Sequence, residues 1–290
     1  PPPPLFFYTP TRPTAIPLRL VGSEMCIRDR YIIHTPTTSL HSAVISKLMS
    51  GCKIFLKLEC MQHTGTFKAR GAISVASEIS KEQKKFGVTA ASAGNHAIAS
   101  AWAARKLEMS AHVVMQSSAN PFRIKVAEAH GAKITLKEAG TPLFAEAERL
   151  VKDEKRTFIH PFEGVHTSLG ASGVGLELMD DIENLDAVIV SVGGGGLISG
   201  VAAAVKEINP NCKVYGVEPI GANSMSQSLM NGQPVTLEKV DTIADSLGAP
   251  MTMKYSLEVA QIARTLSKFF NLNEDLCAVS YTHLTLPTKA

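Results

Sequence analysis

Short apolar segments alternate with longer segments of helical periodicity along most of the chain. The apolar segments have the length and composition of buried strands, and they are 53–58, 87–91, 111–115, 133–136, 157–160, 187–192 and 213–217. The helical segments include 96–106, 122–130, 144–155 and 197–208. Strands that alternate with helices predict an α/β fold in which helices flank a parallel sheet.

Segment 187–192 lacks the alternation of polar and apolar residues that a half-exposed strand has. We therefore expect this strand to be covered on both faces. The wider segment 187–205 is uncharged and nearly long enough to cross a membrane. Four consecutive glycines at its centre would break such a helix, so the sequence predicts a strand, a turn and a helix, and no membrane association.

Charged residues are balanced over most of the chain. The formal net charge is +3, and the excess lies in residues 1–30 and 278–290, so residues 31–277 are neutral overall. No basic segment remains that would indicate nucleic-acid binding. The five cysteines are scattered and form no C-x-x-C pair, which favours free thiols in a reducing compartment. We therefore expect a cytoplasmic protein.

The two ends of the chain differ from the rest. Seven of the sixteen prolines lie in the first seventeen residues, and prolines at this density prevent an amphipathic helix. Residues 1–30 also lack the apolar core of a secretory signal. Residues 278–290 follow the last regular pattern abruptly. We expect both ends to be foreign or disordered segments.

Four glycines, Gly193 to Gly196, stand between a predicted strand and a predicted helix. Backbone N–H groups can converge on a phosphate where no Cβ blocks the approach, and the N-terminus of a helix adds about half a positive charge. The G-x-x-x-x-G-K-[ST] and G-x-G-x-x-G patterns of nucleotide sites are absent. A flexible linker is the alternative, but a strand and a helix adjoin the glycines directly, which favours a phosphate site.

Lys68 lies in the segment Thr-Gly-Thr-Phe-Lys-Ala-Arg-Gly-Ala, residues 64–72. Most lysines are solvated surface charges, but Phe67 and two nearby glycines make a reactive lysine a real alternative. A lysine can hold an aldehyde as an imine, and the glycine turn can hold a phosphate. Pyridoxal 5′-phosphate carries both groups, so the pair of motifs indicates this cofactor.

A second loop, residues 92–96, follows the strand 87–91 and begins the helix 96–106. N–H groups and a hydroxyl at a helix start can bind an anion, here the carboxylate of a substrate. Taken alone, the loop is explained better by an ordinary helix cap from Ser92 or Asn95.

These motifs occur in an order that resembles the threonine/serine dehydratase and serine racemase family. The similarity extends from about residue 34 to residue 277, and the segments that carry it are 64–72, 92–97, 158–162, 193–200 and 216–219. The resemblance implies the two-domain fold of tryptophan-synthase-β-like enzymes that depend on pyridoxal phosphate. It also implies a dehydratase (ammonia-lyase) that converts L-threonine, L-serine or a related β-hydroxy amino acid to a 2-oxo acid and ammonia.

The resemblance implies a role for each matched position. Lys68 would form the imine and then remove the Cα proton, Phe67 would pack against the cofactor ring, and Asn95 would bond the ring's 3-oxygen. The residues expected to cradle the phosphate are Gly193, Gly194, Gly195, Gly196 and Leu197. The residues expected to take the substrate carboxylate are Ser92, Ala93, Gly94, Asn95 and His96.

The sequence departs from the family pattern at three places. Racemases have a serine as second base where Ala93 stands, so elimination is favoured over racemisation. Glu218 and the backbone of Ala222 remain from a racemase-type metal site, but Ser224 replaces a carboxylate, and we expect no metal. The family's partner for the pyridine nitrogen falls beyond residue 277. A racemase, or a truncated protein that binds the cofactor without turnover, therefore stays as the alternative.

The resemblance also suggests how the chain is divided. We expect a large cofactor-binding domain formed by residues 31–74 and 158–277, with a small substrate-loop domain, residues 75–157, inserted in it. The expected partner is a small amino acid substrate, and the expected assembly is a homo-oligomer, either a dimer or a tetramer.

Overall fold

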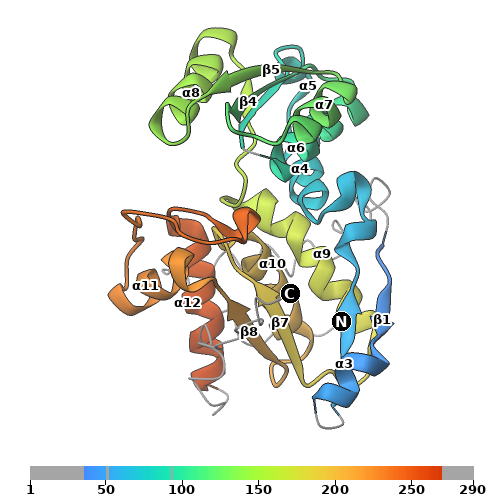
Figure 1. Cartoon of the computed structure of the whole chain (residues 1–290). Helices are drawn as coiled ribbons and strands as arrows, with labels where there is room; N and C mark the ends of the chain where they lie inside the picture. The colour runs from blue at the N-terminus through green and yellow to red at the C-terminus, as the bar shows by residue number, and fades with distance from the viewer. Residues whose placement is uncertain (1–35, 50–51, 93, 270–290) are drawn as a thin grey trace.

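The computed structural model describes residues 36–49, 52–92 and 94–269 (Figure 1). One sheet has the strand order β5-β4-β3-β6, and all of its strand pairs are parallel. Its strands are β3 (Val88–Ala91), β4 (Ala111–Gln116), β5 (Ala132–Lys137) and β6 (Thr157–Phe158). The helices around it are α5 (Lys81–Lys84), α6 (Asn95–Lys106), α7 (Pro121–Ala129) and α8 (Thr141–Glu154). We call residues 81–158 the four-strand unit.

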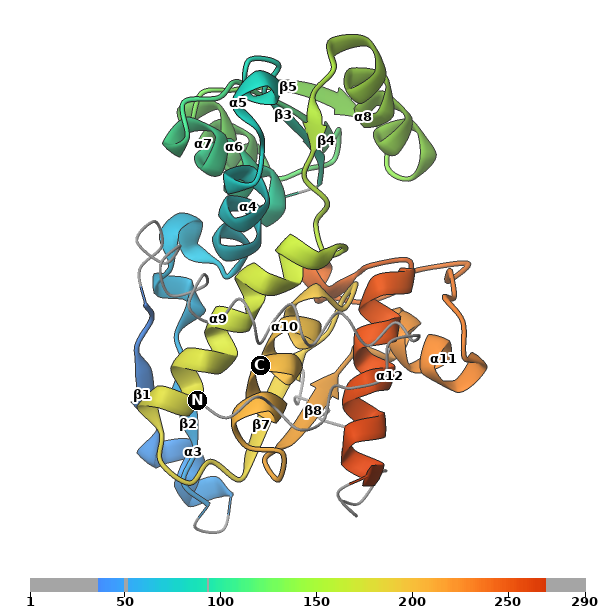
Figure 2. The same ribbon diagram turned by 180° about the vertical axis from the view of Figure 1, so that it is seen from behind.

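A second parallel pair of strands lies in the lower half of Figure 1, and Figure 2 shows it from behind. It consists of β7 (Ala187–Ser191) and β8 (Lys213–Val217). The helices around it are α9 (Val165–Asp181), α10 (Gly196–Ile208), α11 (Ser224–Asn231) and α12 (Lys254–Phe269). We call residues 165–269 the two-strand unit.

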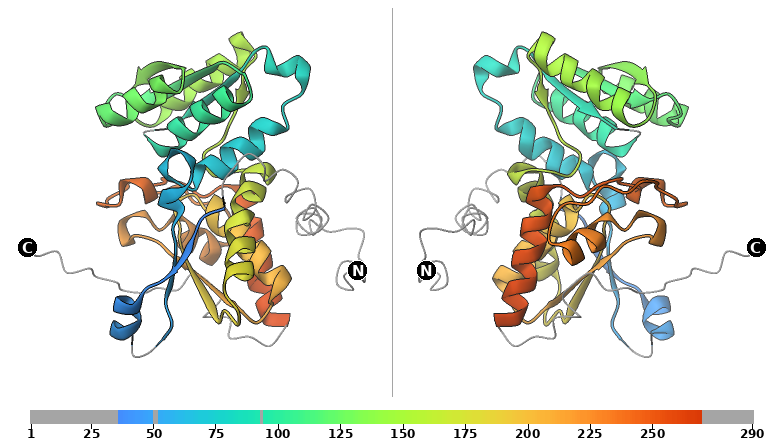
Figure 3. Two further views of the ribbon diagram at one scale, coloured as in Figure 1. Left: turned by 90° about the vertical axis from the view of Figure 1, so that its right-hand side faces the viewer. Right: turned by 90° about the vertical axis from the view of Figure 1, so that its left-hand side faces the viewer.

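The N-terminal part of the described chain lies beside the two-strand unit (Figure 3). It forms an antiparallel pair of strands, β1 (Ser39–His41) and β2 (Phe55–Lys57), joined through α3 (Ala43–Leu48). The expectation of parallel pairing therefore fails for this pair. A short connection that carries a helix of six residues can return the chain alongside itself, whereas a parallel crossover needs a longer connection.

Helix α4 (Lys68–Ser77) joins the two units, because it packs on α6 of the four-strand unit and on α9 of the two-strand unit. The middle of α9 is buried and rich in small residues, so neighbouring backbones approach closely. A Cβ on Gly170 would lie 2.3 Å from the carbonyl oxygen of Arg70, and one on Gly200 would lie 2.3 Å from that of Ser168. Glycine is therefore needed at both contacts.

The largest apolar core lies between α4, α6 and the four-stranded sheet, and Trp102 is buried within it. A second core lies between α9, α10 and one face of β7 and β8, where Val188 and Val190 are buried. The other face of β7 is open, since 70% of Ile189 is exposed. The prediction that this strand is covered on both faces is therefore wrong for the described part of the chain. The run of apolar residues indicates a high propensity to form a strand. It does not indicate whether another element covers the second face of that strand.

The predicted fold class is confirmed. Every strand expected from the apolar segments is present to within a few residues, and α10 ends at Ile208, before Asn209 and Pro210. None of the helices in the described residues has both the length and the apolar character needed to cross a membrane. The predicted end segments, 1–30 and 278–290, lie outside the described residues.

Candidate active site

Lys68 is the first residue of α4, and the backbone before it turns sharply. Thr64 has a φ of 64° and Gly65 has a φ of 72°, so both lie in the left-handed region. This conformation is costly for a β-branched residue such as threonine and marks a constrained turn. The Lys68 amine donates a hydrogen bond to the carbonyl oxygen of Pro161 over 2.5 Å. It also lies 5.0 Å from the centre of the Phe67 ring.

Burial lowers the pKa of Lys68 from its ordinary value of 10.5 to about 8. The neighbour of the amine is a carbonyl oxygen, and among the described residues no carboxylate pairs with the amine to stabilise its charge. A large fraction of the amine is therefore neutral near pH 8. A neutral amine is the form that attacks an aldehyde and the form that accepts a proton.

Two histidines lie beside Lys68, and both imidazoles are neutral. His96 Nε2 lies 2.8 Å from the carbonyl oxygen of Ile159, so this nitrogen carries the hydrogen and donates it. His160 Nδ1 accepts a bond from the backbone N–H of Glu163 over 2.9 Å. Burial, and then the charge of Lys68, lower the pKa of His96 to about 3 and that of His160 to about 4.

A narrow cavity brings Lys68 together with Gly196, the last residue of the glycine turn, although more than one hundred residues separate them in the sequence. Its lining includes Phe67, Lys68, His96, His160, Gly196 and Leu197. The turn has no room for side chains. A Cβ on Gly194 would lie 2.2 Å from the ring of Phe162, and Gly195 has a φ of 96°. The glycines are required by this packing, and they contribute no side chains of their own at the start of α10.

These features fit pyridoxal phosphate on physical grounds. A partly buried amine of lowered pKa can hold the aldehyde. A turn without side chains, at the N-terminus of α10, can hold the phosphate. Both lie on one cavity, which is the arrangement that a single molecule carrying both groups requires.

The second predicted loop lies at the start of α6. Ser92 accepts a hydrogen bond on Oγ from the backbone N–H of Gly94 over 3.1 Å, and Gly94 is the N-cap residue. Asn95 is the first helical residue, and His96 reaches the Lys68 cavity. Ala93 lies outside the described residues. The roles of this loop and of Asn95 stay predictions.

Glu218, which the sequence pairs with a racemase-type metal site, caps a helix in this structure. Its carboxylate accepts bonds from the backbone N–H groups of Met225 and Ser226, both 2.8 Å long, and from the Ser226 hydroxyl over 2.6 Å. Burial raises the pKa of Glu218 despite these bonds. Glu163 caps a helix in the same way at the start of α12, where its carboxylate accepts a hydrogen bond from the backbone N–H of Tyr255 over 2.7 Å.

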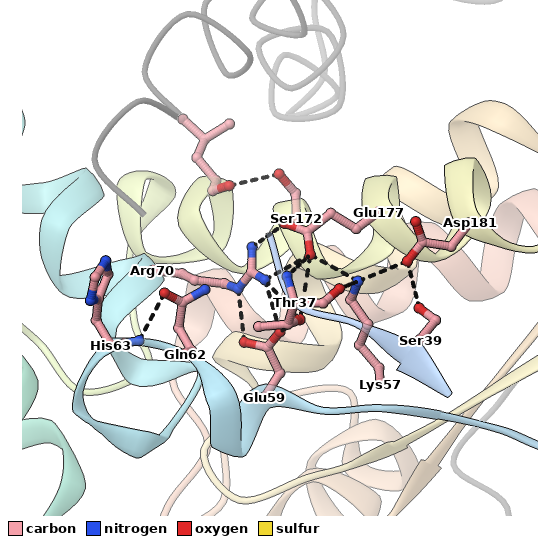
Figure 4. A network of polar contacts seen from close by, with 11 residues as sticks. Thr37, Ser39, Lys57, Glu59, Gln62, His63, Arg70, Ser172, Glu177 and Asp181 are labelled. Carbon is pink, nitrogen blue, oxygen red and sulfur yellow. Dashed lines mark hydrogen bonds and ion pairs between the residues drawn. The ribbon is translucent and has the colours of Figure 1, made fainter. Parts of the chain in front are cut away.

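Sequence reasoning missed the network of buried charges around Arg70, which Figure 4 shows. The guanidinium of Arg70 is fully buried and pairs with Glu59 over 2.8 Å and with Glu177 over 2.6 Å. Lys57 bonds Glu177 over 2.9 Å and Asp181 over 3.2 Å. The signal in the sequence was Arg70 itself, an arginine in an otherwise small and apolar helix, two residues after the lysine.

Comparison with known proteins supports the assignment that the geometry suggests. The sequence pattern of the family described as "Pyridoxal-phosphate dependent enzyme" matches residues 31–279. The chain belongs to this family. The predicted relationship and the predicted cofactor are thereby confirmed.

Two curated relatives illustrate the similarity. The phenylserine dehydratase of Ralstonia pickettii is 41% identical over 239 residues, which cover 82% of this chain and 73% of the relative. The L-threonine ammonia-lyase of Thermotoga maritima is 36% identical over 248 residues, which cover 84% of this chain and 60% of the relative. The chain thus spans between 60% and 73% of the length of these relatives.

Two solved structures share the fold. Maize serine racemase matches with a TM-score of 0.76 and 34% identity, over 80% of this chain and 72% of the racemase. The processed threonine deaminase isoform 2 of Solanum lycopersicum matches with a TM-score of 0.79 and 32% identity, over 84% of this chain and 71% of the deaminase. The similarity therefore extends to both a racemase and a deaminase.

Proposed function

We propose that the protein is a pyridoxal-phosphate-dependent dehydratase (ammonia-lyase) of a β-hydroxy amino acid, which it converts to a 2-oxo acid and ammonia. The observation that carries the proposal is the cavity shared by Lys68 and the glycine turn. The names of the curated relatives, phenylserine dehydratase and L-threonine ammonia-lyase, support the reaction class.

In this proposal Lys68 holds the cofactor aldehyde, the turn Gly193–Gly196 with Leu197 holds its phosphate, and Phe67 and Asn95 contact its ring. The bound cofactor would withdraw electrons from the Cα of an attached amino acid. Once the amino group of the substrate has taken its place on the aldehyde, Lys68 would be free to accept the Cα proton as a neutral amine, and burial lowers its pKa to about 8, which favours this form. His96 and His160 stay neutral beside it, so they add no charge that would lower the basicity of Lys68 further.

The substrate proposed first is L-threonine or L-serine. Phenylserine is the second candidate, since the relative with 41% identity is a phenylserine dehydratase. The assignment of residues 92–96 to the substrate carboxylate belongs to the same proposal. Comparison of 2-oxo acid release from threonine, serine and phenylserine decides between these substrates.

A racemase is the competing activity, because racemases are among the structural relatives. Racemisation needs an acid on the second face of Cα, and the alanine at position 93 has no proton to give. We therefore expect 2-oxo acid from the L-amino acid and no D-enantiomer. D-serine formed from L-serine without pyruvate would favour the racemase.

The central experiment uses the parent chain and Lys68→Ala, each supplied with pyridoxal phosphate. Borohydride reduction followed by peptide mapping should find the cofactor attached at Lys68 in the parent, and 2-oxo acid release should fall by about 10²–10⁴-fold in the variant. A parent that binds the cofactor but forms no product would support the non-catalytic alternative. A variant that traps cofactor and turns over like the parent would refute the assignment.

We also propose the domain division given by the sequence, with one domain formed by residues 31–74 and 158–277 and the other by residues 75–157. The proposed assembly is a homo-oligomer, and the proposed compartment is the cytoplasm. Light scattering of the purified chain tests the assembly. A monomeric mass at micromolar concentration would contradict it.

A further inference from the structure

One salt bridge joins the two units at the candidate site. Arg123 Nη1 on α7 lies 2.9 Å from Asp245 Oδ2, which belongs to a short 3-10 turn (Asp245–Leu247) between α11 and α12. Among the described residues it is the one ion pair between segments 81–158 and 220–261. In Figures 1 and 2 the orange-to-red segment between α11 and α12 lies on the side of the two-strand unit that faces the four-strand unit.

Arg123 itself, and the turn that carries Asp245, each lie against one of the two loops of the site. The Arg123 side chain lies against Gly94, where an added Cβ would be 2.8 Å from Arg123 Cδ and from Nη1. Leu247 lies against Gly193, where an added Cβ would be 3.3 Å from the Leu247 carbonyl oxygen. A displacement of Arg123 therefore removes a packed contact on Gly94, and a displacement of the turn that carries Asp245 removes one on Gly193.

The position of Arg123 is electrostatically unfavourable without a partner. It is the third residue of α7, where the helix dipole places partial positive charge and favours an acid. Asp245 offsets this cost, and the pairing lowers the pKa of Asp245. The bridge is nevertheless weak, because the side chains of Arg123 and Asp245 are 27% and 69% exposed.

We propose that Arg123 and Asp245 are positioning residues that hold the N-terminus of α6 closed over the Lys68 cavity, and that breaking their salt bridge opens the site. The role rests on the proposed function, since it assigns these residues to the entrance of that active site. A weak bridge suits it, because an entrance must open at every turnover.

Hydrogen exchange of the cofactor-free protein tests the bridge without any dependence on activity. The reporter is the amide of Ile98, which donates to the carbonyl oxygen of Gly94 over 3.2 Å. Asp245→Asn and Arg123→Gln should each speed its exchange by about two- to fivefold. The double variant should be no faster than either single variant, because both remove the same interaction.

The matched control is Lys239→Gln, which breaks an exposed ion pair with Asp241 in the same segment. It should leave Ile98 exchange unchanged, and the swapped pair Arg123→Asp with Asp245→Arg should restore slow exchange. Unchanged exchange in Asp245→Asn, equal acceleration in the control, or no restoration in the swapped pair would each overturn the proposal.

A second readout links the bridge to the site. Asp245→Asn should take up pyridoxal phosphate about two- to fivefold faster than the parent. The change in intrinsic protein fluorescence measures the rate of uptake. If exchange at Ile98 accelerates but cofactor uptake does not, the bridge closes the structure without guarding this site, and the entrance role is refuted. A protein that exchanges as expected yet lacks dehydratase activity would refute the proposed function alone.

Discussion

Helices α4 and α6 both begin at residues of the candidate active site, but they are held in different ways. The start of α4, which carries Lys68, is fixed from behind by the buried guanidinium of Arg70 between two carboxylates. The start of α6 is held by the neutral bond of His96 to the carbonyl oxygen of Ile159 and by the exposed bridge of Arg123. The start of α4 is therefore held by buried charges, while the start of α6 is held partly by an exposed ion pair and is the more adjustable of the two.

The physical reason for the difference is solvent. A buried ion pair that loses one partner leaves an uncompensated charge in a poorly polarisable interior, which costs about 3–5 kcal/mol. An exposed pair exchanges its partner for water and costs about 0–1 kcal/mol. A protein can use the first kind of interaction to fix a nucleophile and the second kind to let a substrate enter.

The largest expected effect is that of Arg70→Ala, which removes the cation paired with Glu59 and leaves Glu177 with Lys57 alone, and it should lower the free energy of unfolding by about 3–5 kcal/mol. Urea denaturation measures it. Arg149→Ala is the matched control, since it removes an arginine from an exposed pair with Glu146, and it should leave the free energy of unfolding nearly unchanged because water replaces the lost partner. Equal losses in the two variants would abolish the distinction between fixed and adjustable helices.

Gly170→Ala tests whether α4 can retreat from α9. The new Cβ would lie 2.3 Å from the carbonyl oxygen of Arg70, and the obstacle is backbone. We expect the free energy of unfolding to fall by about 1–3 kcal/mol, near the upper end of this range. Gly175→Ala, where the nearest atom is the carbonyl oxygen of Val201 at 2.9 Å, should cost less in the same assay. The reverse order would show that α4 yields.

Acid should weaken the start of α6, because His96 is buried there as a neutral imidazole. The pKa of His96 is about 3 in the folded protein and about 6.5 in the unfolded chain, so the unfolded chain binds more protons between these values. Stability therefore falls as the pH drops below about 6.5, by on the order of 2 kcal/mol at pH 5. Urea midpoints at pH 7 and pH 5 measure the loss. His96→Gln should flatten this dependence, and an unchanged slope would contradict the assignment.

The smallest expected effect concerns two matched hydrogen bonds, each from a backbone N–H group to a side-chain hydroxyl oxygen. Ser92 Oγ accepts from the backbone N–H of Gly94 before α6, and Thr66 Oγ1 accepts from that of Lys68 at the start of α4, over 3.3 Å. Ser92→Ala should accelerate exchange at the start of α6 by about twofold or more, since a hydrogen bond contributes about 1 kcal/mol. Thr66→Ala should leave the start of α4 unchanged, because Arg70 holds it. Equal responses would remove the contrast.

The sequence by itself determined the elements and the chemistry of single residues. Apolar runs located the strands because a strand needs little more than a short stretch of apolar residues. The glycine turn and Lys68 indicated their chemistry because a missing Cβ and an amine next to a ring act locally. Helix α9 was not predicted because its glycines weaken a helical pattern in the sequence. Those glycines are needed for close packing, and this need becomes visible only when another helix lies against them.

Only the tertiary structure decided how these parts meet. It placed Lys68 and Gly196 on one cavity, buried Arg70 between Glu59 and Glu177, and set Arg123 against Asp245 across the two units. It also left Ile189 exposed on a strand whose composition indicated burial on both faces. Burial, charge pairing and close approach depend on what lies opposite a residue in space, and the order of residues along the chain does not record this.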